Sequence, residues 1–289
     1  MTNCVLKRVI KLLFLQFYTK KGVDFLIEVG TLLDKVRSEK PLVHHLTNWV
    51  TIYDCANIVR MTGALPVMAH AIEESAEMQG ISNSLVLNIG TLTPELIKSM
   101  KQAGKKANEA GHAIVLDAVG VGATTLRTEK AIELIDSLKV DVIKGNKSEI
   151  AKLAGAEVQT RGVEAAEVEE DITELAKKLA GQKNNTVVVT GAEDIVVSTD
   201  KSYLVKNGHP LMSEFVGTGC MVASVIGCFA AVEKNCTDAA AAALSCFGIA
   251  GELAAKEAKA PQAFKQQLFD ELYGLDAKTV SGMQKIEEL

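Results

Sequence analysis

Hydrophobic and polar positions along the chain follow two periodicities, one typical of buried strands and one typical of helices. Short apolar runs such as Ser84–Ile89, Ala113–Asp117 and Thr186–Thr190 predict strands that are buried on both faces. The other expected strands are Leu42–Leu46, Val140–Ile143, Ile195–Ser198 and Tyr203–Val205, the last two as an antiparallel excursion. Segments with apolar residues three and four positions apart predict helices at Asp24–Arg37, Asn48–Thr62, Thr93–Ala110, Thr124–Ser137, Asn146–Ala154, Val163–Ala180, Gly217–Val232, Ala239–Ala258 and Pro261–Tyr273.

The order of these elements indicates the fold class. Apolar strands followed by helices are typical of an α/β protein with a mostly parallel central sheet and helices on both faces. The chain contains no internal repeat, low-complexity linker or proline-rich hinge. We therefore expect one domain over residues 24–289, preceded by an N-terminal extension over residues 1–23.

Residues capable of chemistry follow four of the expected strands. In an open α/β sheet, ligands bind at the carboxyl ends of the strands. The four segments are 88–91 (NIGT), 117–120 (DAVG), 144–146 (KGN) and 190–191 (TG). The pattern alone therefore places a candidate site at one edge of the sheet.

Composition and charge exclude several classes of protein. The chain has 289 residues, of which 48% are hydrophobic, which is enough for a sizeable core and excludes a disordered protein. The net charge of −5 and an aromatic content of 4% argue against nucleic acid as a partner. The six cysteines form no CxxC pair and have no zinc-ligand spacing with a histidine, so we expect a reducing, cytoplasmic location.

Residues 1–23 differ from the rest because they carry five basic side chains and no acidic one. Their apolar run, Leu12–Leu15, is too short to cross a bilayer, and no small-residue cleavage site follows it. An amphipathic helix on a membrane surface is one interpretation. A family-specific extension, or an upstream start codon on a cytosolic enzyme, is the interpretation that we favour. We expect no stable membrane insertion.

The strongest motif is the glycine turn Gly217-Thr218-Gly219-Cys220, directly before a long apolar helix. Glycines let the backbone approach a ligand, and the free N–H groups of a helix start favour an anion such as a transferring phosphoryl group. A simple glycine-rich helix entry is the alternative. Cys220 lies in the turn, where a helix N-terminus lowers a thiol pKa, so it can accept a proton from a substrate hydroxyl. The alternative interpretation is that Cys220 is a small buried residue without a catalytic role.

Three further candidates lie at or after strand ends: one pair of residues and two single residues. Asn146 and Glu149 are three residues apart at a helix start, so both can face one point, and a carboxylate there can hold Mg²⁺. The same pair also fits a helix cap, and both interpretations can hold together. Lys144 can meet nucleotide phosphates. Asp117 suits either a metal or phosphate site or a turn. The five histidines are interpreted as structural or surface residues.

Taken together, these segments resemble the hydroxyethylthiazole kinase family of the ribokinase-like superfamily. The resemblance extends from about Leu32 to Leu272. It rests on segments 41–44 (PLVH), 47–48 (TN), 64–69 (ALPVMA), 85–92 (LVLNIGTL), 115–120 (VLDAVG), 122–124 (GAT), 145–146 (GN), 149–150 (EI) and 217–220 (GTGC). It implies a ribokinase-like three-layer sandwich and transfer of phosphate from ATP, with Mg²⁺, to 4-methyl-5-(2-hydroxyethyl)thiazole for thiamine synthesis.

The resemblance also implies roles for single residues. Met68, Gly217 and Asn48 would contact the thiazole alcohol; Lys144, Thr190 and Asn146 would bind ATP; Asp117 and Glu149 would hold Mg²⁺ and phosphate. Cys220 takes the position of the superfamily's basic Asp, with Gly217 and Gly219 in the same catalytic turn. The family is typically a homotrimer with sites between subunits, so Asn48 would reach the substrate of a neighbouring chain.

Two positions depart from the family pattern. Lys144 replaces a usual Arg, which keeps the charge but loses the planar fork, and Ala118 replaces a usual Pro. Three other functions remain open at this point. They are a kinase of another small alcohol (hydroxymethylpyrimidine or pyridoxal), a nucleotide-using lyase that repairs hydrated nicotinamide cofactors, and a binding protein without enzymatic activity.

Overall fold

A single continuous sheet organises the molecule. The computed structural model describes residues 26–156 and 171–289, and within them nine strands follow the order β2-β1-β3-β4-β5-β6-β7-β8-β9. The strands are β1 (Leu42–Leu46), β2 (Leu65–Val67), β3 (Ser84–Asn88), β4 (Ala113–Asp117), β5 (Val142–Asn146), β6 (Thr186–Thr190), β7 (Asp194–Val197), β8 (Ser202–Val205) and β9 (Ile286–Glu288). Strands β1 to β6 pair in parallel and β7 to β9 antiparallel, which confirms the mostly parallel sheet and the antiparallel excursion.

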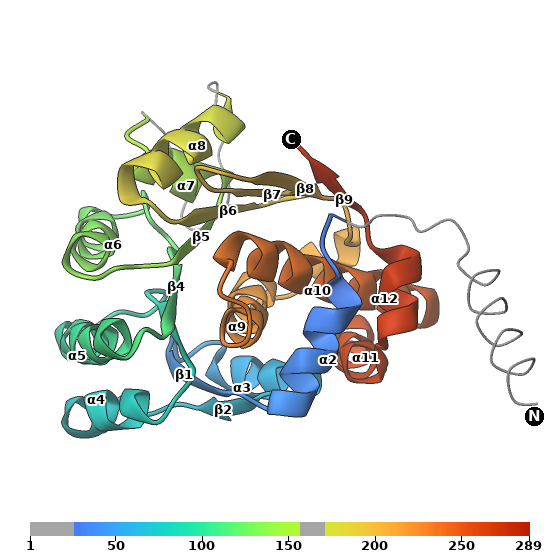
Figure 1. Cartoon of the computed structure of the whole chain (residues 1–289), viewed down its shortest axis with the longest axis horizontal. Coiled ribbons are helices and arrows are strands. Elements are labelled where there is room, and N and C mark those ends of the chain that lie inside the picture. Colours follow the sequence, from blue (N-terminus) through green and yellow to red (C-terminus); the bar gives the residue numbers. More distant parts are fainter. Residues whose placement is uncertain (1–25, 157–170) are drawn as a thin grey trace, which may run out of the picture.

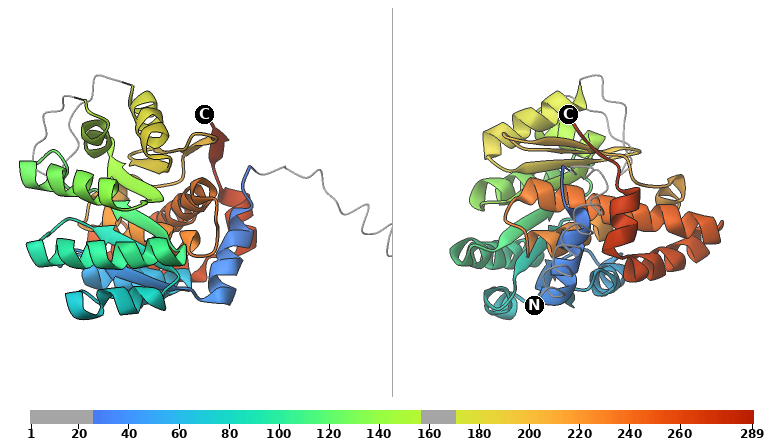
Figure 2. Two further views of the ribbon diagram at one scale, coloured as in Figure 1. Left: turned by 60° about the vertical axis from the view of Figure 1, so that its left-hand side comes forward. Right: turned by 45° about the vertical axis from the view of Figure 1, so that its right-hand side comes forward.

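Helices cover both faces of this sheet, so the fold is the expected three-layer sandwich (Figures 1 and 2). One layer contains α4 (Ile72–Gly80), α5 (Pro94–Ala110), α6 (Thr125–Ser137), α7 (Lys147–Leu153) and α8 (Ile172–Lys183). The other layer contains α2 (Val29–Glu39), α3 (Ile52–Thr62), α9 (Thr218–Ala230), α10 (Cys236–Glu257), α11 (Pro261–Gly274) and α12 (Ala277–Met283). A short 3-10 helix, η1 (Pro210–Ser213), precedes α9.

The two layers explain why the central strands have apolar residues at successive positions rather than at alternate ones. Side chains of a strand alternate between the faces, and both faces of this sheet are covered. Five buried valines share the core under α9 and α10, namely Val43, Val86, Val115, Val142 and Val188. Leucine and isoleucine at alternate positions share the core under α5 and α6, namely Leu85, Leu87, Ile114, Leu116 and Ile143.

Capping residues define both ends of helix α5, as the sequence predicts. The Thr93 side chain accepts a hydrogen bond from the Leu96 N–H at the start of α5, and Pro94 occupies the first helical position. Gly111 ends the helix in a left-handed conformation, with φ of 69°. The predicted helix and its ends are therefore confirmed.

Other element boundaries differ from the prediction for identifiable reasons. The helix expected from Asn48 begins at Ile52, because the Asn48 Oδ1 accepts the N–H groups of Val50 and Thr51 in a turn. Strand β5 extends to Asn146, so Lys144 lies in the strand. The helix expected over Val163–Ala180 is observed as α8, and its predicted start lies outside the described residues.

The sequence pattern missed several short elements. Strand β2, helix α4, helix α12, the 3-10 helix η1 and strand β9 were not predicted. Strands of three residues are too short to display a periodicity. Helix α4 (IEESAEMQG) buries only Ser75 and Gln79, which are polar, so it has no apolar stripe to read.

Helix α10 is the one described helix that is long and apolar enough to cross a membrane. Of its most apolar window, 83% is buried inside the fold. It packs against α9 and α11 and against β7 and β8, and its buried face is rich in alanine. Its apolar composition is therefore accounted for by its central position in the core.

Candidate active site

The carboxyl ends of β1, β3, β4 and β5 meet beneath the start of α9. Parallel strands place the residues that follow them at one edge of the sheet, and α9 packs against β3 and β4. A methyl group at Gly219 would lie 2.9 Å from the Nζ of Lys144. The strand ends therefore gather at one edge of the sheet, as their pattern predicted, and the glycine turn touches the end of β5 there.

A chain of side-chain hydrogen bonds connects three strand ends to the thiol of Cys220. The Nδ2 of Asn48 donates to the Oδ1 of Asn88 at 2.9 Å and to the Cys220 Sγ at 3.3 Å. The Nδ2 of Asn88 donates to the Asp117 Oδ2 at 2.7 Å and to the same Sγ at 3.3 Å. Two amide groups therefore orient the thiol and join it to the Asp117 carboxylate.

Asp117 and Lys144 form a buried ion pair at the centre of the site. The Lys144 Nζ lies 3.0 Å from the Asp117 Oδ1, and the side chains are only 4% and 0% exposed. Burial raises the pKa of the Asp117 carboxyl, against the effects of Lys144 and Asn88. Burial alone would lower the pKa of Lys144, but the Asp117 and Glu149 carboxylates outweigh it and raise that pKa, so the ammonium persists.

Glu149 connects the turn after β4 to the start of α7. Its Oε1 accepts the Gly120 N–H at 2.8 Å, and its Oε2 accepts the Asn146 N–H at 2.7 Å. The Asn146 side chain in turn accepts the Glu149 N–H, which completes a capping box. The predicted cap is confirmed. Burial raises the pKa of the Glu149 carboxyl despite the nearby Lys144. A cation bound here would therefore stabilise the charged form of Glu149.

The expected lowering of the Cys220 pKa is wrong. Loss of contact with water raises the pKa of this thiol, and the Asp117 carboxylate raises it further. Lys144, Thr51 and Asn88 act in the opposite direction without reversing the shift. The position at a helix start favours a thiolate, but burial of the thiol, together with the adjacent Asp117 carboxylate, outweighs that effect on the pKa.

Glycine is required at both positions of the turn for different reasons. Gly217 has φ of 106°, and a Cβ there would lie 2.9 Å from the Thr51 Cγ2. At Gly219, a Cβ would press on the Lys144 ammonium. The turn is therefore packed directly against the polar site, which a simple helix entry would not need.

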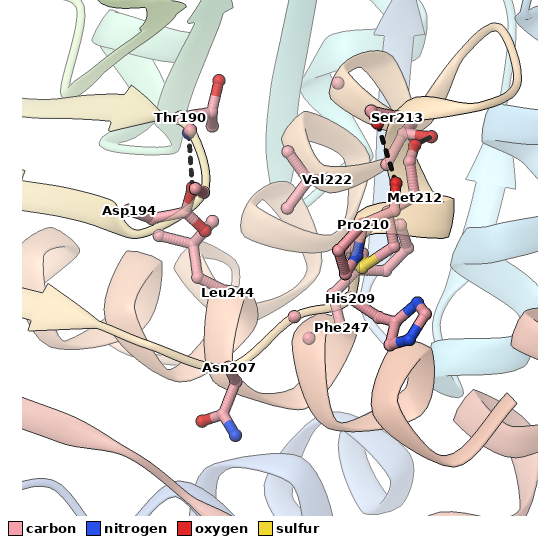
Figure 3. A pocket seen from close by; sticks show the side chains of 16 residues that line it. Thr190, Asp194, Asn207, His209, Pro210, Met212, Ser213, Val222, Leu244 and Phe247 are labelled. Atoms are coloured by element: carbon pink, nitrogen blue, oxygen red, sulfur yellow. Dashed lines mark hydrogen bonds between the residues drawn. The ribbon is translucent and has the colours of Figure 1, made fainter. Parts of the chain in front are cut away.

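A cavity of about 500 Å³ opens beside this turn. Figure 3 shows Thr190 and Asp194 on one side of it and Pro210 and Met212 on the other. Its apolar wall comes from Val222, Leu244 and Phe247, and the volume suits a small-molecule ligand. Because Thr218 and Gly219 also line it, the cavity is continuous with the glycine turn.

Comparison with known proteins gives the family. The profile of the Hydroxyethylthiazole kinase family matches residues 33–278. A hydroxyethylthiazole kinase of Methanosarcina mazei is 55% identical over 257 residues, which cover 89% of this chain and 98% of that protein. This chain belongs to the hydroxyethylthiazole kinase family. A hydroxyethylthiazole kinase of Desulfatibacillum aliphaticivorans is 45% identical over 89% of this chain and 96% of its own.

Solved structures agree with this assignment. A hydroxyethylthiazole kinase protein from Pyrococcus horikoshii is similar with a TM-score of 0.83 and 41% identity, over 90% of this chain and 98% of that one. A Bacillus subtilis pyridoxal kinase has a TM-score of 0.55 at 17% identity over 72% of this chain and 90% of its own, so it shows the fold alone. The pyridoxal kinase and lyase alternatives are therefore not favoured.

Most of the predicted site residues of this kinase lie together. Asp117, Lys144 and Glu149 form one charged group, and Cys220 lies on it with Gly217, Gly219 and Asn48 close by. Thr190 lines the cavity and donates to the Gly145 carbonyl at 3.3 Å. The half-buried Asn146 is the cap of α7.

The structure gives contacts for two expected substrate residues. Asn48 is buried and bonded to the Cys220 of its own chain, and its expected role toward the substrate of a neighbouring chain stays a prediction. Met68 is half-buried in the segment after β2. Its carbonyl lies 3.1 Å from the His70 Nδ1, and His70 connects it to Thr47, the residue before Asn48.

Sequence reasoning missed four residues that build the site of this kinase. Asn88 was noted only as a strand end, although its amide joins Asp117 to Cys220. Thr51 lies under the glycine turn. Arg127 donates to carbonyls in the loops after β3 and β4, and His70 joins the segments after β1 and β2. An Asn at a strand end beside a strand ending in Asp was a usable signal, whereas the partners of Arg127 and His70 depend on the tertiary structure.

Proposed function

We propose that this kinase transfers the γ-phosphoryl group of ATP to the hydroxyl of 4-methyl-5-(2-hydroxyethyl)thiazole, giving the thiazole phosphate used in thiamine synthesis. The observation that carries the proposal is the family match over residues 33–278, which includes the glycine turn and all the charged residues beneath it. The turn offers N–H groups at the start of α9, and these favour a transferring phosphoryl group.

Cys220 is the proposed proton acceptor. Its Sγ receives two amide hydrogen bonds that fix its position at the edge of the glycine turn. Phosphoryl transfer passes through a loose transition state, so positioning and charge neutralisation matter more than a strong base. A thiol with a raised pKa is compatible with that role because the proton leaves the substrate hydroxyl late.

The cavity is the proposed ATP site. Thr190 lines it, and Lys144 and Asn146 lie on the adjacent strand β5. The buried ammonium of Lys144 lies against Gly219, where it would neutralise charge on the transferring phosphate. Because Lys144 has no planar fork, we expect it to act as a point charge rather than a bidentate clamp.

Asp117 and Glu149 are the proposed ligands of Mg²⁺. Each of their four oxygens accepts one hydrogen bond and retains a second lone pair. In the described part of the chain there is no group of three or more metal-binding side chains. Two carboxylates fit Mg²⁺, which usually keeps waters and binds substrate phosphates. When bound, the ion supplies neutralisation of phosphate charge.

We further infer a homotrimer whose sites lie next to an interface between subunits. The supporting observation is an exposed apolar patch at the mouth of the site, formed by Trp49, Val50, Tyr53 and Val216, which are 58% to 77% exposed. Val216 precedes Gly217, and Gly217 touches Thr51, so the four residues are neighbours. Clustered apolar exposure of this kind marks an interaction surface.

A cytoplasmic location and a single catalytic domain over residues 24–289 complete the proposal. The described cysteines Cys55, Cys220, Cys228, Cys236 and Cys246 are all free, which suits a reducing compartment. The continuous sheet and the family match support one domain. The proposed extension over residues 1–23 lies outside the described residues.

The direct test is ADP release with Mg-ATP and a panel of heteroaromatic alcohols. The panel contains hydroxyethylthiazole, hydroxymethylpyrimidine and pyridoxal, each titrated to saturation. We expect the highest kcat/KM with the thiazole alcohol. A preference for another alcohol would overturn the proposed substrate while keeping the kinase chemistry. An absence of turnover with every alcohol, in a folded protein, would overturn both.

A further inference from the structure

His70 joins two turns that the proposed function assigns to the acceptor alcohol. Its Nε2 lies 3.0 Å from the Thr47 backbone nitrogen, directly before Asn48. Its Nδ1 lies 3.1 Å from the Met68 carbonyl oxygen. Thr47 and Met68 follow the neighbouring strands β1 and β2, so one imidazole spans the gap between the two turns.

The two contacts define the tautomer of His70. The Thr47 N–H is a donor, so Nε2 must present its lone pair. Nδ1 then carries the proton and donates to the Met68 carbonyl. The Thr47 carbonyl, 3.1 Å from Nε2, receives no hydrogen bond in this state. The neutral ring is therefore used as a donor on one turn and an acceptor on the other.

The ring of His70 also packs on Trp49, the residue after Asn48. The ring centroids are 4.8 Å apart with an interplanar angle of 32°. His70 thus contacts the residues on both sides of Asn48, whose amide donates to the Cys220 Sγ. A shift of His70 would move Asn48 and the Met68 backbone relative to each other.

A second histidine holds the same segment from behind but does not span the gap. The Nε2 of His44 lies 3.0 Å from the Ala69 carbonyl, and its Nδ1 lies 3.2 Å from the Gln79 Oε1. His44 is fully buried in the sheet, and burial lowers its pKa. His44 therefore secures the segment to the fold, whereas His70 sets its distance from the Asn48 turn.

We propose that His70 is a positioning residue that sets the width of the acceptor-alcohol pocket between Met68 and Asn48. The inference rests on the proposed function, because that function assigns Met68 and Asn48 to the heteroaromatic alcohol. His70 itself touches neither Cys220 nor the charged group in the contacts described. Its removal is therefore expected to weaken binding of the alcohol most, with a smaller effect on the transfer step through Asn48 and with ATP binding preserved.

The test compares His70→Ala with His112→Ala in the full-length protein. His112 is a half-buried histidine on the far side of Gln79, with its Nδ1 3.3 Å from the Gln79 Nε2. Loss of two hydrogen bonds and a ring contact at His70 is expected to raise the KM for the thiazole alcohol about tenfold. The KM for ATP is expected to stay within about twofold, as is every constant of His112→Ala, and kcat is expected to fall by less than the alcohol KM rises.

Conservative variants distinguish positioning from general stability. His70→Asn can donate to the Met68 carbonyl, and His70→Gln can accept the Thr47 N–H. Each is therefore expected to have a KM for the alcohol between those of the wild type and His70→Ala. Two results for His70→Ala would overturn the inference. One is an equal change in the KM for the alcohol and the KM for ATP, and the other is an unchanged KM for the alcohol. If His70→Ala does not fold, the Asn and Gln variants answer the same question.

The proposed function and this inference fail in different ways. Wild-type turnover that prefers another alcohol would overturn the thiazole assignment, and the His70 comparison would then use that alcohol. If no alcohol is phosphorylated, calorimetric binding of hydroxyethylthiazole to the wild type and His70→Ala replaces kinetics. Weaker binding to the variant would support positioning, and equal or absent binding would overturn it.

Discussion

The thiol of Cys220 lies between two amide donors and a buried carboxylate, and this combination decides its chemistry. The amides fix the sulfur, while burial and the Asp117 charge raise its pKa. A base of this kind is deprotonated in a larger fraction of molecules as pH rises. At the residue scale, burial and the adjacent carboxylate therefore control the pKa of this thiol more than the helix start does.

Cys220→Asp is expected to remain active, because a carboxylate at this position also accepts a proton. Since carboxylates ionise at lower pH than thiols, the kcat of the variant should persist to lower pH than that of the wild type. Cys220→Ala is the matched control, with kcat reduced roughly tenfold to a hundredfold. The measurement is kcat against pH for all three proteins. A folded Cys220→Asp protein without turnover would contradict the proposed base.

Glu149→Gln is expected to raise the Mg²⁺ concentration needed for half-maximal activity and to lower kcat. The amide removes the charge that a cation needs but still accepts the N–H of either Gly120 or Asn146. Glu149→Ala removes both hydrogen bonds and is expected to cost about 1–2 kcal/mol of stability as well. A Mg²⁺ titration with thermal melts separates the two effects. An unchanged titration in Glu149→Gln would exclude Glu149 as a ligand.

At the element scale, the loops after the strands are held by backbone contacts that fix the site before any ligand binds. The Arg127 guanidinium donates to the carbonyls of Ile89, Gly90 and Val119, so it joins the loops after β3 and β4. The Gly120 N–H in the second loop then holds Glu149. A charge on α6 thereby sets the position of a carboxylate at the start of α7.

Gly217→Ala and Gly111→Ala separate backbone strain from the geometry of the site. Both glycines have positive φ, 106° and 69°, so each alanine is expected to cost roughly 1–2 kcal/mol. A Cβ at Gly111 meets nothing within 4 Å, whereas one at Gly217 presses on Thr51. We expect a somewhat larger loss in the free energy of unfolding for Gly217→Ala, because of the added contact with Thr51, and a large loss of kcat/KM only in that variant. Equal activity in the two variants would show that the turn is not catalytic.

The elements that the sequence predicted well are those whose signal is local. Strands β3, β4 and β6 each contain an uninterrupted run of three apolar residues or more, and α5 carries its own cap at Thr93. The start of α3 was misplaced because the Asn48 side chain binds the turn that delays it. Helix α4 was missed because its few buried residues are polar.

The sequence predicted those parts of the candidate site that lie at strand ends or in the glycine turn. Strand order brings Asp117 opposite Lys144 in register, and that pairing follows from parallel neighbours. The predicted direction of the Cys220 pKa shift was wrong because the shift depends first on burial of the thiol and then on the nearby Asp117 carboxylate, and residue spacing gives neither. His70 was interpreted as structural or surface, since its contacts with Thr47 and Met68 exist only after β1 and β2 pair.

At the scale of the whole molecule, the apolar patch at the site mouth carries the proposed trimer. Trp49 and Tyr53 are 58% and 77% exposed, and Trp49 packs on His70. The site and the patch therefore share the turn after β1. Covering the patch with another subunit would shield the turn from water and restrict the movement of Asn48. Assembly and activity are expected to depend on each other for this reason.

Tyr53→Glu is expected to dissociate the trimer, because a charge at the centre of an apolar interface loses its hydration on assembly. Ile81→Glu is the matched control, since Ile81 is 68% exposed at the end of α4 in the opposite helix layer. Light scattering is expected to give a trimer for the wild type and Ile81→Glu and a monomer for Tyr53→Glu. Activity of Tyr53→Glu should fall at a given protein concentration and recover partly as that concentration rises. A wild-type monomer, or a trimeric Tyr53→Glu, would contradict an interface at this patch.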